Sequence, residues 1–278
     1  MNRRILLAAL SAAALLLLPF LKLSQAITSL PDISALSQIA AGQEITPIYD
    51  LRGNLIYEYH SPTYGEKKPV PLSEISDEMI ALTITTEDSR FFTNPGFSPA
   101  AILRAIMQNF HLRETYSGAS TITQQIVKNV LLPPDERYVR SITRKIKEIL
   151  LAAMITAKYD KEMILSIYLN DIYYGHGATG VEKAAEIYFG KHASELDLAE
   201  AAFISGLPQA PNYYGIDYDA GSRRRRETLN ILERMIRVYR CIPVESGSDP
   251  GMYCPTQEDI RKANDEPLPL ILEKGPKN

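Results

Sequence analysis

A basic start followed by an apolar run constrains this chain more than any other feature. Arg3 and Arg4 precede Ile5–Leu21, an apolar run of 17 residues that one Ser and one Pro interrupt. A bilayer core needs about 20 apolar residues, with roughly 17 as the lower limit, and the basic end stays in the cytoplasm. We therefore expect residues 1–26 to be an uncleaved membrane anchor. Ser24–Ala26 resembles a small-residue cleavage site, so a cleaved signal peptide is the alternative. Either way, the rest of the chain works outside the cytoplasm.

Composition excludes several classes of protein. The chain has 278 residues, 45% hydrophobic and 23% charged, with a formal net charge of −3. These values are typical of a globular protein and exclude a disordered chain, a polytopic membrane protein and a globally basic nucleic-acid binder. Two Cys and four His residues exclude a disulfide scaffold and a cysteine-rich zinc module. We expect no nucleic-acid partner.

The two cysteines have two interpretations. Cys241 and Cys254 flank a stretch rich in Pro, Gly and Ser, and they can close a small loop in an oxidising compartment. Two unrelated free thiols are the alternative, and the sequence leaves both open.

The chain divides into four parts: the anchor at 1–26, a spacer at 27–44, one domain at 45–240 and a C-terminal tail at 241–278. The domain opens with two short runs rich in Ile and Tyr, Ile45–Tyr49 and Leu55–Tyr59, around Asp50–Asn54. This pattern predicts a β-hairpin. The tail is rich in Pro, Gly and charge, so we expect it to lie on the surface or to be disordered.

Apolar periodicity predicts that the rest of the domain is mainly helical. Ser76 can cap a helix to about Thr86, and Thr121 with Gln124 fits a capping box for a helix that Pro133 stops. The other predicted helices are 99–110, 138–157, 160–171, 179–188, 196–206 and 222–239.

Glu87 and Asp88 are the first candidates for chemistry. They end an apolar helix and precede Phe91 and Phe92. The negative end of the helix dipole and the aromatic neighbours both raise the pKa of a carboxyl group, which suits a general acid or base. The alternative is a surface ion pair between Glu87 and Arg90.

The segment Gly118–Gln125, with Lys128 one turn later, is the second candidate. Its small and polar residues open a helix, where free backbone N–H groups favour anions. Plain N-capping is the alternative.

Arg144, Lys145 and Glu148 are the third group. Helical spacing places Ile142, Ile146, Ile149, Leu150 and Ala153 on one face of a helix. Glu148 points away from that face, with Leu151 and Ile155 near it on the same side, and such apolar neighbours are less typical of a solvated acid. A structural Arg144–Glu148 salt bridge is the alternative role. A basic run, Arg223–Arg226, opens the last helix of the domain and suits either an anionic partner such as lipid headgroups or a solvated face.

The order of these motifs resembles a known family. Glu-Asp-x-x-Phe, Gly-x-Ser-Thr-Ile-Thr-Gln-Gln, Arg-Lys-x-x-Glu and Lys-x-x-Ile-Leu-x-x-Tyr-Leu-Asn follow one another along the chain. The pattern is similar to the peptidoglycan glycosyltransferases, glycosyltransferase family 51. This is the transglycosylase domain of class A penicillin-binding proteins and their monofunctional relatives. The resemblance covers about residues 45–240.

The resemblance implies a lysozyme-like, mainly helical fold with a short N-terminal β-hairpin behind one transmembrane helix. It implies an enzyme that polymerises lipid II into β-1,4-linked glycan strands at the outer face of the bacterial cytoplasmic membrane. Glu87 would act as the general base that deprotonates the acceptor 4-hydroxyl, with inversion at the donor and release of polyprenyl diphosphate. Glu148 would be the second essential carboxylate.

The resemblance also implies the ligands and partners. Lys128, Arg144 and Lys145 would hold the diphosphate, together with a divalent cation, Mg²⁺ or Mn²⁺. The other substrate-binding residues that it implies are Asp88, Ser120, Thr121, Gln124, Gln125 and Asn170. The partners would be lipid II, the growing lipid-linked strand, the membrane and other cell-wall synthesis proteins.

Three departures from the family pattern qualify this assignment. Asn94 stands where the family usually has His, and the fifth motif, Arg-x-x-x-Val-Leu, is only approximated by Arg225–Asn230. No Ser-x-x-Lys or Lys-Thr-Gly occurs, so we expect a monofunctional enzyme without a transpeptidase domain. A non-catalytic scaffold that binds lipid II is one alternative, with Asn94 as its only support. A lytic transglycosylase or muramidase is the other, and the basic residues argue against it because cleaving glycan releases no diphosphate.

Overall fold

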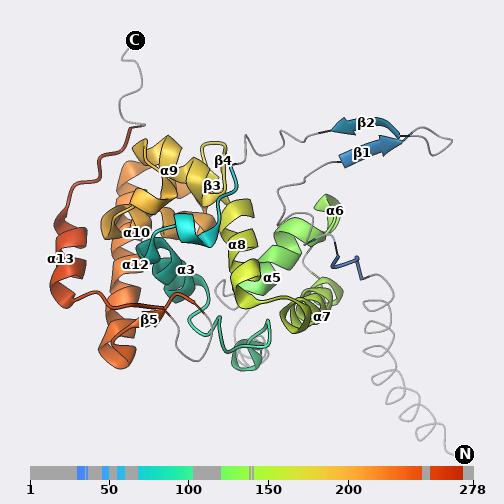
Figure 1. Cartoon of the computed structure of the whole chain (residues 1–278), viewed down its shortest axis with the longest axis horizontal. Coiled ribbons are helices and arrows are strands. Elements are labelled where there is room, and N and C mark those ends of the chain that lie inside the picture. The colour runs from blue at the N-terminus through green and yellow to red at the C-terminus, as the bar shows by residue number, and fades with distance from the viewer. Residues whose placement is uncertain are drawn as a thin grey trace, which may run out of the picture.

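The computed structural model describes residues 30–34, 36, 46–49, 55–59, 68–102, 120–137, 139, 141–245 and 251–271 (Figure 1). Over these ranges the chain is mainly helical, as the sequence predicts. The predicted anchor at 1–26 and most of the spacer at 27–44 lie outside the described residues. Among the residues that are described, no helix combines the length and the apolar character needed to cross a bilayer.

Helices provide most of the secondary structure. The α-helices are α3 (Asp77–Glu87), α5 (Ile122–Ile126), α6 (Pro134–Arg137), α7 (Ile142–Lys158), α8 (Lys161–Asp171), α9 (Val181–Phe189), α10 (Leu198–Gly206), α11 (Pro211–Tyr214), α12 (Tyr218–Tyr239) and α13 (Gln257–Asp265). The other helical turns are η1 (Leu72–Glu74), η2 (Val127–Leu131, a π-helix), η3 (Ala193–Glu195) and η4 (Leu207–Gln209). The predicted 99–110 helix is helical at 99–102, and its remainder lies outside the described residues.

The described strands form three antiparallel pairs. These are β1 (Thr46–Tyr49) with β2 (Leu55–Tyr59), β3 (Tyr173–Gly175) with β4 (Ala178–Thr179), and β5 (Ile242–Pro243) with β6 (Met252–Tyr253). The first pair confirms the predicted hairpin, with Thr46 opposite Tyr59 and Ile48 opposite Tyr57.

Helix α3 is the central element of the core. The Ser76 side chain accepts a hydrogen bond from the Met79 N–H and so caps the helix as predicted. Every residue from Met79 to Thr85 is buried, which is the pattern of a helix enclosed on all sides. Helices α10 and α12 pack against α3, whereas α5 packs against α7 and α8. Hydrogen bonds from Ile122 to Asp88 and from Gln125 to Glu87 join the C-terminal end of α3 to α5, and so connect the two groups of helices.

The buried face of α7 is the one that carries Glu148. Ile142 is 68% exposed, whereas Lys147, Glu148, Leu151, Ala152 and Ile155 are buried. Glu148 therefore lies away from the isoleucine face and beside Leu151 and Ile155, as the spacing predicts. Apolar spacing found a stripe of isoleucines, but the face that packs carries an ion pair, and burying a charge is tolerated when it is paired.

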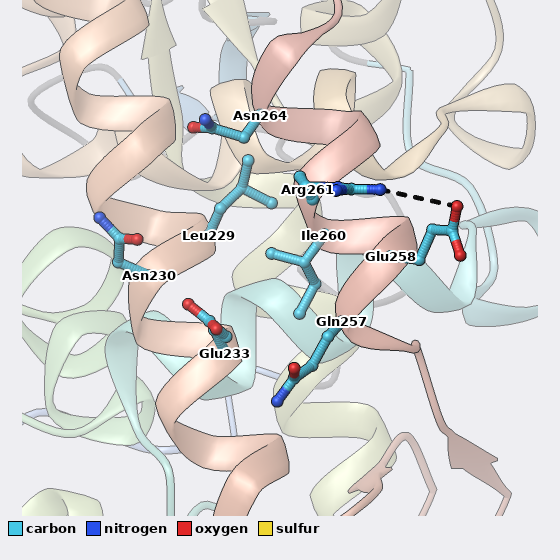
Figure 2. A pocket seen from close by; sticks show the side chains of 8 residues that line it. All are labelled: Leu229, Asn230, Glu233, Gln257, Glu258, Ile260, Arg261 and Asn264. Atoms are coloured by element: carbon cyan, nitrogen blue, oxygen red, sulfur yellow. Dashed lines mark ion pairs between the residues drawn. The ribbon is translucent and has the colours of Figure 1, made fainter.

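The C-terminal part of the chain is folded over residues 251–271. Leu229 of α12 and Ile260 of α13 line a groove of about 420 Å³. Figure 2 shows these two side chains facing each other. Ile260, Ala263, Leu268 and Leu270 are buried. Of the two predicted alternatives, this segment takes the surface one: most of its polar residues are exposed, and a few apolar residues at helical spacing attach it to a neighbouring helix.

A disulfide bond joins Cys241 to Cys254 and resolves the open question in favour of a loop. Replacing both cysteines by serine is expected to lower the free energy of unfolding by about 2–3 kcal/mol, since the bridge spans 13 residues. Urea unfolding with and without reductant measures this. Reductant should destabilise the wild type and leave the double variant unchanged, and equal unfolding curves for all four samples would contradict the prediction.

Candidate active site

Glu87 is the last residue of α3 and is partly buried. Gln125 Nε2, from α5, donates to Glu87 Oε2 over 2.6 Å. Burial raises the pKa of Glu87, and the hydrogen bond from Gln125 and the charge of Arg224 oppose this rise. Both Glu87 and Arg90 are described, and no ion pair joins them. Glu87 therefore has the environment of a base whose pKa is raised, as its neighbours in the sequence predict.

Asp88, the C-cap of α3, uses its carboxylate to hold neighbouring parts of the protein together. Its two carboxylate oxygens accept from Asn94 Nδ2 at 2.9 and 2.8 Å, and Oδ2 also accepts from the Ile122 N–H. Burial raises the pKa of Asp88, and these hydrogen bonds oppose the rise. Its contacts therefore tie the end of α3 to the start of α5.

Asn94 connects Asp88 to Lys161 of α8. Lys161 Nζ donates to the Asn94 carbonyl oxygen over 2.9 Å and to Oδ1 over 3.2 Å, and Oδ1 also accepts from the Gly96 N–H. Burial lowers the pKa of Lys161 to about 8. Gly96 has a φ of +91°, and a Cβ there would lie 2.2 Å from the Ala152 carbonyl oxygen, so the turn requires glycine. An uncharged Asn thus satisfies every polar partner at the position where the family usually has His.

Replacing Asn94 by alanine is expected to lower the free energy of unfolding by about 2–3 kcal/mol, because it leaves partly buried donors and acceptors without partners. Thermal melting measures this. Thr93→Ala, at the exposed neighbour, is the control and should change stability by no more than about 0.5 kcal/mol. Equal melting temperatures for both variants would show that the Asn94 contacts contribute nothing.

The start of α5 contains the predicted capping box. Thr121 Oγ1 accepts from the Gln124 N–H, and Gln124 Oε1 accepts from the Thr121 N–H. Thr121 Oγ1 also donates to the Gly96 carbonyl oxygen over 2.6 Å. These contacts of Thr121 and of Gln124 Oε1 therefore hold the start of α5, as the N-capping alternative predicts.

Glu148 is the centre of a second group of charges. Its side chain is 3% exposed; Oε1 accepts from Arg144 Nη1, and Oε2 accepts from Lys145 Nζ over 3.0 Å. Lys145 Nζ also donates to Ser120 Oγ over 2.9 Å. Lys128, in the π-helical turn after α5, is close enough to feel these charges. Burial lowers the pKa of Lys128 most, and the charges of Arg144 and Lys145 lower it further. The charge of Glu148 opposes this decrease. We call Lys128, Arg144, Lys145 and Glu148 the cation cluster.

Three cations around one carboxylate suit a polyanionic ligand better than a metal ion. Both Glu148 oxygens already accept from cations. Within the described ranges, no three His, Cys, Asp or Glu side chains lie close enough together to hold a metal. The residues present therefore do not fit a metal held by the protein alone. Two or more clustered cations are what a diphosphate requires.

Sequence reasoning missed Arg224 as a site residue. The charge of Arg224 lowers the pKa of Glu87, and Arg224 Nε donates to the Gly206 carbonyl oxygen over 3.2 Å. Arg225 instead is buried and donates to the carbonyl oxygens of Asn264 and Glu266, which attaches the C-terminal segment. Arg223 and Arg226 are exposed. The signal was the spacing from Arg224 to Thr228-Leu229, which matches Arg-x-x-x-Val-Leu one residue earlier than expected.

The hydrogen bonds of Asn170 do not connect it to these groups. Its Oδ1 accepts from the Val70 N–H, and its Nδ2 donates to the carbonyl oxygens of Val70 and Ser166. The side chain holds the segment before α3 against α8. The structure thus joins Glu87 to Gln125 of α5, and Ser120, just before α5, to Lys145 of the cation cluster.

Comparison with known proteins decides the family. A family model described as Transglycosylase matches residues 52–236. The chain belongs to the transglycosylase family. Penicillin-binding protein 1A of Aquifex aeolicus is 39% identical over 208 residues, 75% of this chain and 27% of the relative. Penicillin-binding protein 1A of Escherichia coli is 41% identical over 209 residues, 74% of this chain and 23% of the relative. The chain thus spans about a quarter of the length of these curated relatives.

A crystal structure of Penicillin-binding protein 1A from Haemophilus influenzae is 22% identical, with a TM-score of 0.40, covering 82% of this chain and 21% of that chain. The transglycosylase region of the present chain includes Glu87, all of α5, the cation cluster and Arg224. The site described above therefore lies within the part of the chain that defines the family.

Proposed function

We propose that this chain is a peptidoglycan glycosyltransferase that polymerises lipid II into β-1,4-linked glycan strands. The observation that carries the proposal is the arrangement about α5. Gln125 of α5 contacts Glu87, a carboxyl group of raised pKa, and Ser120, before α5, contacts Lys145 of the cation cluster. A sugar transfer that expels a diphosphate needs these two groups and no acid for the leaving group.

In the proposed mechanism, the Glu87 carboxylate takes the proton from the acceptor 4-hydroxyl. That oxygen forms a bond to the anomeric carbon of the donor with inversion, and the bond from this carbon to the diphosphate oxygen breaks. The electron pair leaves with the polyprenyl diphosphate, whose negative charge Lys128, Arg144 and Lys145 stabilise. Glu148 holds Arg144 and Lys145 in place for that role.

The remaining expectations belong to this proposal. We place the enzyme at the bacterial cytoplasmic membrane, held by residues 1–26, with its domain on the extracytoplasmic face and a lysozyme-like fold. Its partners are lipid II, the growing strand and other cell-wall synthesis proteins. The family's divalent cation, Mg²⁺ or Mn²⁺, would have to take most of its ligands from the substrate diphosphate. No step above depends on it.

Incubating the purified chain with lipid II in detergent micelles tests the proposal. We expect a glycan polymer and one released polyprenyl diphosphate per bond formed. Binding of lipid II without polymer would support the non-catalytic scaffold, although the contacts of Asn94 remove the observation that suggested it. Cleavage of purified glycan strands without use of lipid II would support a lytic enzyme. Either result would refute the proposed function.

A further inference from the structure

Three side chains from three helices form a hydrogen-bonded line that ends on Glu87. The Tyr168 hydroxyl, from α8, donates to Gln125 Oε1 over 3.3 Å. Gln125 Nε2, from α5, donates to Glu87 Oε2 over 2.6 Å. Tyr168 is 1% exposed, so water does not compete for its hydroxyl. We call these three residues the amide relay.

The two ends of the Gln125 carboxamide are chemically different. Its oxygen only accepts and its nitrogen only donates hydrogen bonds. With the Tyr168 hydroxyl donating to the oxygen, the nitrogen faces Glu87, and an N–H donor favours the ionised carboxylate. The reversed amide would place oxygen against oxygen, an arrangement that only a protonated Glu87 tolerates. The direction of the amide and the charge of Glu87 are therefore coupled.

We propose that Tyr168 is a positioning residue for this site: its hydroxyl holds the Gln125 carboxamide with the donor end toward Glu87 and so keeps the partly buried carboxylate ionised. The inference rests on the proposed role of Glu87 as general base. Burial alone would leave Glu87 protonated over a wider pH range, and a protonated carboxyl group cannot accept the proton of a sugar hydroxyl.

The chain supplies a matched control in Tyr174 of β3. Tyr174 is 0% exposed, and its hydroxyl has no hydrogen-bond partner within the described part of the chain. Burial, followed by the charge of Glu87, raises the pKa of both tyrosines. Both are thus buried phenols near the same carboxylate, but only Tyr168 contacts Gln125.

The other charged or titratable groups that act on Glu87 come from its own helix end and from the elements packed around it. They are Asp88 at the end of α3, Arg224 of α12, Tyr168 of α8 and Tyr174 of β3. Replacing either tyrosine by phenylalanine leaves the charges of Asp88 and Arg224 in place. A difference between Tyr168→Phe and Tyr174→Phe therefore reports on the hydroxyl that contacts Gln125.

The test measures the pKa of Glu87 directly and the pH dependence of polymerisation separately. The full chain is labelled with glutamate ¹³C at the side-chain carboxyl, and the Glu87 signal is assigned by its loss in Glu87→Gln. We expect Tyr168→Phe to raise the pKa of Glu87 by up to about one unit, because without the Tyr168 hydroxyl the hydrogen bond from Gln125 to the Glu87 carboxylate is partly lost. The acidic limb of the kcat–pH profile for lipid II polymerisation should move by the same amount. Tyr174→Phe should change neither.

A double-variant cycle keeps the test specific. Gln125→Met removes the amide and should raise the pKa of Glu87 at least as much, after which adding Tyr168→Phe should produce no further rise. An unchanged NMR pKa in Tyr168→Phe, or a full second rise in the double variant, would overturn the relay. A raised NMR pKa with an unmoved acidic limb would uphold the relay and refute Glu87 as the base. The two failures are therefore distinguishable.

Discussion

Replacing Glu87 by glutamine is expected to lower the rate of glycan polymerisation by a factor of about 10²–10⁴, the usual contribution of a general base. The same substitution should stabilise the fold at neutral pH. Burial raises the pKa of Glu87 above its ordinary value, so the folded state holds a proton that the unfolded state has already lost. Stability therefore falls as the pH rises through the interval between the ordinary and the raised pKa values. Glutamine removes this loss of stability.

Polymerisation of lipid II and thermal melting at pH 7 measure the two effects in one set of samples. Asp77→Asn, at the exposed opposite end of α3, is the control, and it should retain activity and lose a little stability through the helix dipole. A Glu87→Gln variant with more than about a tenth of wild-type activity would exclude Glu87 as the base. A lower melting temperature would show that the carboxylate stabilises the fold instead.

Helix starts with clear capping residues could be predicted from the sequence. A start whose first turn contains a helix-breaking residue could not. Ser76 and Thr121 cap helices where expected. Helix α12 begins at Tyr218, after the cap Asp217, whereas the predicted start is residue 222. The predicted start is late because Gly221 within the first turn argues against a helix. The structure explains that glycine: a Cβ there would lie 2.6 Å from the Phe203 ring. Close packing between helices is a tertiary requirement that no local pattern reports.

The candidate site shows the same division. The types of residue at 87, 125, 128, 144, 145 and 148 identified two chemical groups. Spacing alone could not separate the residues that hold the backbone from those that face an open site. Asp88, Thr121 and Asn170 are chemically suited to bind substrate, but their described hydrogen bonds go to protein groups. The sequence could not show which of the four adjacent arginines faces the site, because their directions depend on how α12 packs.

Replacing Glu148 by glutamine is expected to abolish polymerisation and also to destabilise the fold, which distinguishes it from Glu87→Gln. Removing one partner of a buried ion pair leaves the other charges uncompensated and costs about 3–5 kcal/mol. Because Arg144 and Lys145 are 18% and 38% exposed, water will reduce that cost to about 2–3 kcal/mol. For a domain of this size the melting temperature should fall by roughly 4–12 °C. The carboxylate thus has to hold Arg144 and Lys145 in place before substrate arrives.

Glu233→Gln on α12 is the control, since Glu233 and Arg237 form an i,i+4 pair with side chains 30% and 61% exposed. It should change the melting temperature by no more than about 2 °C, because exposed pairs contribute little. High salt separates the two roles of Glu148, since added anions neutralise the uncompensated cations. Stability of Glu148→Gln should partly recover in 1 M salt, while polymerisation should not. A variant that melts like the wild type at low salt would show that Glu148 acts only on substrate.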